Sequence, residues 1–326
     1  MTNSLHPMTG TLEAPNTATA STIAQQFAPG QLKTHLETLL ASSCAALATD
    51  YAENAYDAVT LLDSIVRPSE RVIRRVPPNA QRILAIARDE TADVEQLVML
   101  VAFDPAVIRG LLRLANSSIY ARPGSNPCVS IADAVRRVGA GGVESVVLRC
   151  MVEAMFCQPG GAHAPVADVV WSHMVRTAGI GRALGTAFSA NLDEAFLLSM
   201  MHDVGKLIVF DRIGALRTAQ RREIVLPPEF LWATLRVVHE ALGGLAALEW
   251  GLGEVAASAI ASHHRTQVFA ASDRESQVTY LAECVDIART KGRPLALGQW
   301  AANGSLIVGP EAIEAALAKA ARADGG

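Results

Sequence analysis

The sequence predicts an all-α fold, and three observations lead to that class. Apolar residues recur at spacings of three and four along most of the chain, which is the period of a helix with one buried face. Neither an internal repeat nor the β–α–β order of a parallel sheet is visible. Ala, Leu and Val abound in a composition that is 50% apolar but only 5% aromatic. This mixture favours packed helices over a β-sandwich.

Length, charge and cysteine usage narrow the class of protein. A chain of 326 residues can form one large domain or two ordinary ones. The net charge of −4 gives no general reason to expect nucleic acid as a partner, and the local basic cluster of Arg71, Arg74 and Arg75 is most simply a solvated face. The five cysteines lack CxxC spacing, which indicates reduced thiols and a cytoplasmic protein. Charges interrupt every apolar run before it reaches spanning length, so we expect no membrane segment.

The N-terminal region divides into a tail and a helical extension. Residues 1–30 hold a single charged residue, Glu13, among many Thr, Ala, Ser and Pro residues. They lack the basic start and apolar run of a secretory signal, so a disordered tail is predicted. Residues 31–70 have helical periodicity and predict two helices. We interpret these helices either as an extension of the main domain or as a surface for self-association, through which the protein could form a homo-oligomer.

The first half of the main domain is predicted over residues 71–160. Pro77-Pro78 starts one helix, and Asp104-Pro105 supplies the N-cap and first-turn residue of another. Asn116 is expected to end that helix, because Asn tolerates the left-handed conformation. Ser130 caps the next helix, and glycines separate it from a long apolar helix that ends near Phe156.

The second half is predicted over residues 165–291, after a hinge formed by glycines and Pro165. Pro227-Pro228 is predicted to end one helix and to separate it from the next. Further helices are expected over residues 255–264 and 278–290, and residues 292–326 form a C-terminal segment with a short helix.

The stretch of residues 196–210 reads as one helix that is apolar on nearly every side and therefore buried. Its middle nevertheless carries His202, Asp203 and Lys206, and a buried charge must be paired or bound to something. Four further histidines in helical segments are candidates to converge there: His173, His239, His263 and His264. Each could also be an ordinary hydrogen-bonded core residue.

Several motifs occur in one consistent order along the chain. The first half contains Arg75-Val-Pro-Pro, Asp104-Pro105 and the run from Leu111 to Ser117, and the second half contains Trp171-Ser-His173, His202-Asp203-Val-Gly205-Lys206, His239-Glu-Ala-Leu-Gly243 and His263-His264. This order resembles the HDOD domain, the "HD-related output domain" of bacterial signalling proteins. The resemblance covers roughly residues 72–291 and implies a multi-helical HDOD fold, with an N-terminal helical half and an HD-like C-terminal half. Such domains are related to the HD metal-dependent phosphohydrolases and are usually described as regulatory.

The resemblance also implies a set of metal ligands. His173, His202, Asp203 and a final acidic residue would form one site, and His239 and His263, next to His264, would complete a second. The final acid stays open between Glu283, which has the expected position, and Asp286, which has the expected residue type. Imidazole and carboxylate ligands suit Fe, Mn or Zn, so one or two divalent ions are the expected cofactors. Lys206 either pairs with Asp203 or, in an enzyme, contacts a substrate phosphate.

Two functions from different classes follow. The first is a stand-alone regulatory module that acts through signalling protein partners or a small nucleotide ligand, with no direct contact to nucleic acid. The second is a metal-dependent phosphohydrolase acting on a nucleotide or cyclic dinucleotide. After His263-His264 the chain lacks the glutamate and the glycine-tyrosine-proline element of the HD-GYP phosphodiesterases. This departure favours the regulatory function, because a shared fold does not carry its chemistry with it.

Overall fold

The computed structural model describes residues 30–51, 56–89, 91–117, 120, 126–156, 161–264, 274–302 and 306–324. In these ranges the regular elements are helices and there is no strand, which confirms the all-α class. None of the described helices is long and apolar enough to cross a membrane. Apart from Gly30, the predicted disordered tail lies outside the described residues.

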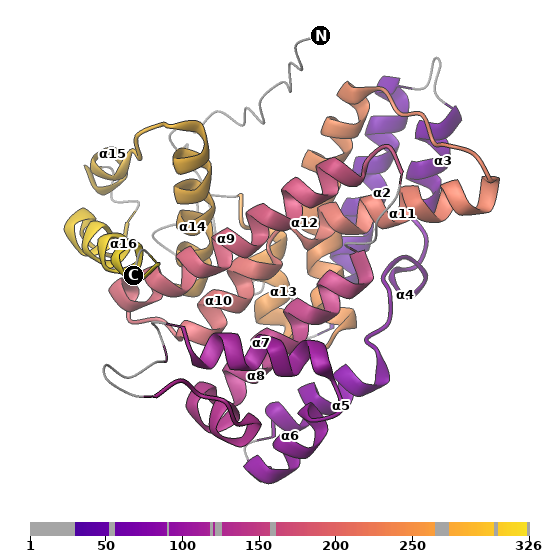
Figure 1. Cartoon of the computed structure of the whole chain (residues 1–326). Helices are drawn as coiled ribbons and strands as arrows, with labels where there is room; N and C mark the ends of the chain where they lie inside the picture. Colours follow the sequence, from indigo (N-terminus) through magenta and orange to yellow (C-terminus); the bar gives the residue numbers. More distant parts are fainter. Residues whose placement is uncertain are drawn as a thin grey trace.

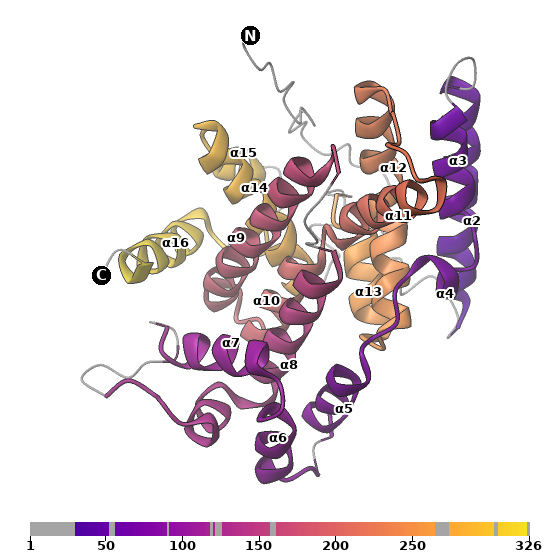
Figure 2. The same ribbon diagram turned by 45° about the vertical axis from the view of Figure 1, so that its right-hand side comes forward.

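The predicted N-terminal extension packs into the core of its own chain. It forms α2 (Gln31–Tyr51), α3 (Tyr56–Ile65) and the short α4 (Ser69–Val72). Figure 2 shows α2 and α3 side by side at one edge, next to α12 (Pro228–Glu249). The residues that α2 buries recur at helical spacing: Leu32, Leu36, Leu40, Cys44 and Leu47. This apolar stripe therefore covers α12 and does not lie on the molecular surface.

The N-terminal half forms the lower part of the molecule in Figure 1. Its helices are α5 (Pro78–Ala87), α6 (Val94–Val101), α7 (Pro105–Ala115) and α8 (Ile131–Phe156). Asp104 caps α7 as predicted, because its carboxylate accepts from the backbone N–H groups of Ala106 and Val107 at 3.0 and 3.2 Å. Gly139 has a φ of +70° and bends α8 near its start, where the sequence predicts a separation.

Asn116 ends α7 by a different route from the predicted one. Its φ of −95° and ψ of 0° lie outside the left-handed region. The side chain instead binds the backbone of Cys128: Nδ2 donates to the carbonyl oxygen at 2.8 Å, and Oδ1 accepts from the N–H at 2.6 Å. The amide thus tethers the segment before α8 to the end of α7, which a left-handed turn alone would not do.

Replacing Asn116 by Ala should lower the free energy of unfolding by about 1–2 kcal/mol, because two backbone groups of Cys128 lose their partner. Asn116→Asp is the matched control, since a carboxylate can accept from the N–H but cannot donate to the carbonyl oxygen. Urea unfolding should place Asp between Ala and the wild type. An Ala variant as stable as the wild type would contradict the tether.

The C-terminal half forms the upper part of Figure 1. It consists of α9 (Ala164–Phe188), α10 (Leu192–Met201), α11 (Val204–Gln220), α12, α13 (Gly253–Ala261) and α14 (Arg274–Lys291). Two sequence predictions are wrong here. Residues 196–210 form no single helix, because α10 ends at Met201 and α11 begins at Val204. The helix expected to reach residue 264 ends at Ala261, so His263 and His264 lie in a turn.

The C-terminal segment contains more structure than the single short helix predicted. Its described part holds α15 (Leu297–Ala302) and α16 (Pro310–Asp324). Together with α9 and α14 these helices enclose a second apolar core, whose larger members are Leu184, Phe188, Leu281, Trp300 and Ile313. Of the predicted hinge, Gly160 lies outside the described residues, Gly161 has a φ of +91° just before α9, and Pro165 lies in the first turn of α9.

Candidate metal centre

The break between α10 and α11 places His202 and Asp203 in a turn inside the core. Asp203 has a φ of −102° and a ψ of 8°, outside a regular helix, and the backbone N–H of Lys206 donates to its carbonyl oxygen at 2.9 Å. Both side chains are fully buried. On a continuous helix they would diverge by about 100°. The turn instead lets both face one point.

Three other segments bring their histidines to this point. His173 comes from the middle of α9, His239 from α12, and His263 from the turn after α13. Neighbouring imidazole rings, such as His202 and His263, have centroids 5.1 Å apart. The predicted convergence of His173, His202, Asp203 and His239 in one cluster is therefore present in the structure.

Hydrogen bonds fix the orientation of the four imidazoles. In each ring Nδ1 contacts an oxygen that can only accept: His202 with the Ser199 carbonyl at 2.8 Å, His239 with the Arg236 carbonyl at 3.0 Å, His263 with the Ile260 carbonyl at 2.6 Å, and His173 with the Asp286 carboxylate at 2.7 Å. Nδ1 must therefore carry the proton, which leaves Nε2 as a lone-pair acceptor in the neutral ring.

All four Nε2 atoms surround the carboxylate of Asp203. Its Oδ2 lies 3.8 Å from His173 and 3.6 Å from His202. Its Oδ1 lies 3.7 Å from His239 and 3.8 Å from His263, and has no hydrogen-bond partner among the described residues. One carboxylate thus stands between two pairs of imidazoles.

When the rings are neutral these contacts join acceptor to acceptor, and a metal ion between the Nε2 atoms would satisfy both. The Nε2 atoms of His173 and His202 are 3.2 Å apart, and those of His239 and His263 are 3.4 Å apart. Two neutral rings with both protons on Nδ1 cannot hydrogen-bond through Nε2. Ligands at about 2.0–2.2 Å around one metal ion lie about 3–3.5 Å from each other. The residues therefore fit a divalent ion on each side of Asp203.

Burial favours the neutral, metal-binding form of three imidazoles. It lowers the pKa of His202, and it lowers the pKa values of His239 and His263 well below that of a free imidazole. At His173 burial is the largest influence and also lowers the pKa, but the hydrogen bond to Asp286 and the charges of Asp203 and Glu283 together outweigh it, so the pKa is raised. The second layer therefore makes His173 the most basic of the four rings.

Asp203 and Asp286 stay ionised in spite of burial. Burial opposes the charge of Asp203, but the ammonium of Lys206, 2.6 Å from Oδ2, and the nearby imidazoles hold its pKa well below the usual range. Burial also opposes the charge of Asp286, and hydrogen bonds from His173 and Arg176 lower its pKa to about 2. The predicted pairing of Lys206 with Asp203 is therefore the arrangement that the structure has.

Glu283 and Asp286 lie on different sides of His173. A Glu283 carboxylate oxygen lies with His173 and His202 in one group of possible ligand atoms within 4.8 Å of one another, and Oε2 makes no hydrogen bond in the described chain. Asp286 contacts the Nδ1 side of His173 and accepts two bonds from Arg176 at 2.7 and 3.0 Å. The Glu283 carboxylate thus lies where it could bind an ion together with His173 and His202, whereas Asp286 orients the His173 ring from its other side.

His264 stands at the outer edge of the cluster. It joins Asp203, His239 and His263 in the second group of possible ligand atoms. Its Nδ1 lies 3.4 Å from Glu283 Oε2, and its side chain is 39% exposed. The structure therefore brings together seven of the eight residues predicted as ligands, with Asp286 one layer behind.

One residue of the centre was missed by sequence reasoning. Arg176 forms a two-pronged ion pair with Asp286, although its own side chain is 48% exposed. Its position three residues after His173 on α9 puts both on one helix face, and this spacing was the available signal. Through Asp286, Arg176 links the surface of the protein to a buried imidazole.

A model of the HDOD domain matches residues 73–266. The chain belongs to the HDOD domain family. The match lies inside the predicted domain of residues 71–291 and ends before α14, which carries Glu283 and Asp286. No curated protein matches the chain.

Solved structures share the fold at low sequence identity. A candidate metal-dependent phosphohydrolase from Shewanella amazonensis SB2B aligns with a TM-score of 0.60 and 18% identity, covering 74% of this chain and 86% of that one. A candidate phosphohydrolase from the same organism gives 0.55 and 19%, with 76% and 90% covered. An HDOD domain protein with unknown function from Geobacter sulfurreducens gives 0.51 and 19%, with 69% and 77% covered. Likeness at this level shows the fold alone.

Proposed function

We propose that this chain is a non-catalytic regulatory module of bacterial signal transduction whose core binds one or two divalent metal ions. His173, His202, Glu283 and Asp203 Oδ2 would hold an ion on one side, and Asp203 Oδ1, His239, His263 and His264 on the other. A bound ion would supply a fixed positive charge that ties α9 to α14 together. The module would act through a protein partner or a small signalling ligand in the cytoplasm.

The burial of the ligand set is the observation that carries this proposal. Of the eight candidate residues, only His264 has a side chain that is more than one-third exposed. A phosphate ester would have to reach the ions to be hydrolysed, because substrate oxygens must enter the metal coordination sphere. Lys206, a candidate phosphate contact, already donates to Asp203 at 2.6 Å and is itself buried. The buried centre is therefore better suited to stabilising one conformation of the fold when metal is bound than to hydrolysing a substrate.

The alternative is a metal-dependent phosphohydrolase acting on a nucleotide or cyclic dinucleotide. The ligand types favour it, since imidazoles and carboxylates around one bridging Asp suit ions that activate water. Both functions predict that the protein binds metal, but only the phosphohydrolase would turn over a phosphate ester.

Metal analysis together with a turnover assay separates the two functions. The purified protein should keep about one Fe, Mn or Zn ion per chain or more after dialysis. It should hydrolyse neither bis(p-nitrophenyl) phosphate nor a cyclic dinucleotide faster than His202→Ala, a control that removes one ligand. Hydrolysis by the wild type that disappears in His202→Ala would establish the enzyme instead, and a metal-free wild type would refute both functions.

A further inference from the structure

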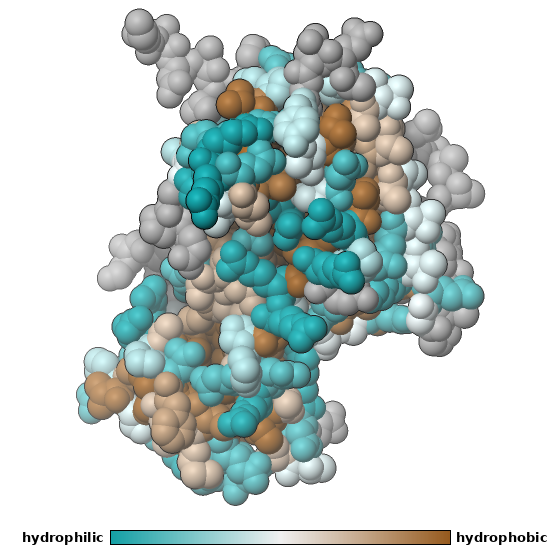
Figure 3. All heavy atoms as spheres, turned by 90° about the vertical axis from the view of Figure 1, so that its right-hand side faces the viewer, coloured by the Kyte–Doolittle hydropathy of each residue, from teal (hydrophilic) through white to brown (hydrophobic). Residues whose placement is uncertain are grey.

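A second polar site lies away from the metal centre, at the junction of the two halves. Residues 73–77 form an extended connector between α4 and α5 that crosses the end of α12. A cavity of about 350 Å³ opens beside it, lined by Ile73, Arg74, Arg75, Val76, Gln81 and Glu249. Figure 3 shows hydrophilic side chains gathered over the middle of the face on which α4 lies. A volume of this size is typical of small-molecule sites.

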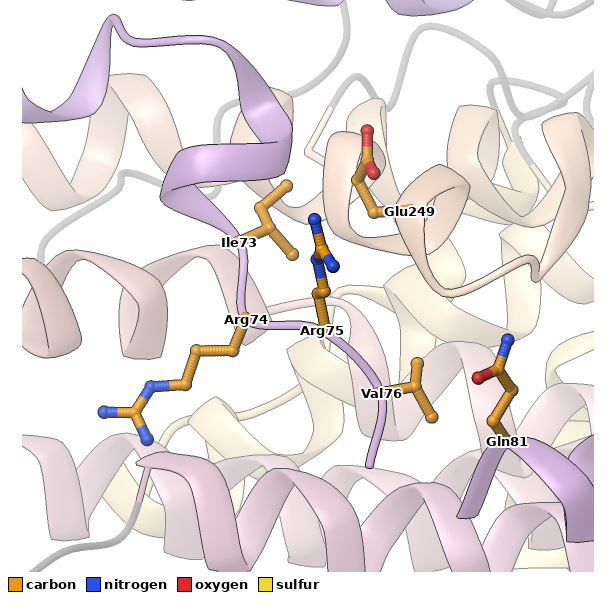
Figure 4. Close-up of a pocket in the computed structure, with 6 residues that line it drawn as sticks. All are labelled: Ile73, Arg74, Arg75, Val76, Gln81 and Glu249. Carbon is orange, nitrogen blue, oxygen red and sulfur yellow. The ribbon is translucent and has the colours of Figure 1, made fainter. Parts of the chain in front are cut away.

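The connector is held in place by its own contacts. The indole Nε1 of Trp250 donates to the carbonyl oxygen of Arg74 at 2.9 Å. The Arg74 side chain forms an ion pair with Asp211 and lies over the ring of Phe156, 6.0 Å from its centroid. Figure 4 shows Arg74 pointing to the opposite side of the connector from Arg75. The charge of Arg74 is therefore matched within the fold.

Arg75 is left with an unmatched charge at the cavity. Its guanidinium points toward the end of α12 (Figure 4), and among the described residues it has neither an ion pair nor a hydrogen bond. The nearby carboxylate of Glu249 is matched by Lys33 at 2.8 Å and by Ser69 Oγ at 2.8 Å. The side-chain amide of Gln81 also makes no hydrogen bond in the described chain. Within the part of the chain that the structure describes, the cavity thus offers a guanidinium and an amide that make no other polar contact.

We propose that this cavity binds a small organic anion with one carboxylate or phosphate group and an apolar body. Arg75 would pair with the anionic group through two parallel hydrogen bonds, the geometry in which guanidinium recognises planar oxyanions. Gln81 would contact its polar edge, and Ile73 and Val76 supply an apolar wall. Such a ligand would touch α5 of the first half and α12 of the second, and its binding requires no metal ion.

The indole of Trp250 provides a built-in reporter of binding. It is one of four tryptophans, and Trp250→Phe assigns its N–H signal in a spectrum of ¹⁵N-labelled protein. Phenyl phosphate and benzoate are the anionic probes, inorganic phosphate tests the charge alone, and benzyl alcohol is the neutral control. We expect a saturable shift of the Trp250 signal with phenyl phosphate or benzoate and none with benzyl alcohol. Whichever anion binds more tightly assigns the phosphate or the carboxylate class.

Matched variants show whether Arg75 carries the recognition. Arg75→Gln should weaken the apparent affinity at least about tenfold, because it removes one charge-assisted pair. Arg71→Gln removes an exposed charge that does not line the cavity, and should change the affinity less than about twofold. Metal content should be unchanged in both variants. No saturable shift with any anion, or equal weakening by both variants, would overturn the proposal.

Discussion

Replacing Gly205 by Ala should destabilise the protein by about 3 kcal/mol or more. A Cβ atom at this position would lie 2.0 Å from the carbonyl oxygen of His239, and 2.7 and 2.8 Å from its carbonyl carbon and Cα. These are backbone atoms of α12, so no side chain can rotate to make room. Overpacking costs about 1–3 kcal/mol where neighbours can adjust. Here α11 and α12 would have to separate, which would also move His239 of α12 away from Asp203, just before α11.

Gly214 offers a matched control on the same helix. A Cβ at Gly214 would meet nothing within 4 Å. Gly214→Ala should therefore stabilise the protein by about 0.5–1 kcal/mol, the helix-propensity difference between the two residues. Urea unfolding followed by circular dichroism should give opposite signs for the two variants. Similar midpoints for both would show that the close approach of α11 to α12 is not needed for stability.

The parts of the fold that local chemistry dictates could be predicted from the sequence. Asp104 caps α7 because its short side chain, just before Pro105, can accept hydrogen bonds from backbone N–H groups in the first turn, which have no partner within the helix. The break at His202-Asp203 could not be predicted, because Met201 and Val204 on either side are apolar, and the nearby Gly205 lies inside α11 and not at the break. Tertiary packing produces this break, since the turn places both side chains inside the centre.

The composition of the centre was predictable, but its layering was not. Buried histidines on apolar faces require partners, and this alone indicates that they converge. Glu283 and Asp286 are three residues apart on one face of α14. Sequence spacing therefore cannot tell which of them reaches the ligand atoms and which supports His173. The same limit applies to Arg176, whose partner Asp286 is 110 positions away.

The N-terminal extension illustrates a different limit. Its helical stripe of leucines predicts one buried face, as the structure has it. The spacing of a stripe does not identify the surface against which it packs, which can belong to a second copy of the chain or to the same chain. Leu36 packs against Gly244 of α12, because a Cβ atom added to Gly244 would lie 2.9 Å from Leu36 Cδ1. The stripe is therefore buried inside the chain, and the predicted homo-oligomer through residues 31–70 stays a prediction.

Asp203→Ala should have a large effect on both metal content and stability. Asp203 is the one carboxylate that faces all four imidazoles, so the variant should retain less than about one-tenth of the wild-type metal. In metal-free protein the change leaves the ammonium of Lys206 without its partner at 2.6 Å, in a side chain only 9% exposed. Breaking a buried ion pair from one side costs about 3–5 kcal/mol. Metal analysis and urea unfolding in the presence of a chelator measure the two effects.

Lys206→Met is the matched variant, because it removes the ammonium and keeps the carboxylate. Asp203 Oδ2 then has no competing cation, so metal binding should be retained and become tighter. In metal-free protein Asp203→Ala combined with Lys206→Met should be less destabilised than the sum of the single changes, by about 2 kcal/mol, since no buried charge is left unpaired. If Asp203→Ala keeps its metal and loses less than about 1 kcal/mol, Asp203 neither bridges ions nor holds Lys206. If the two single changes simply add, the 2.6 Å contact contributes no coupling energy.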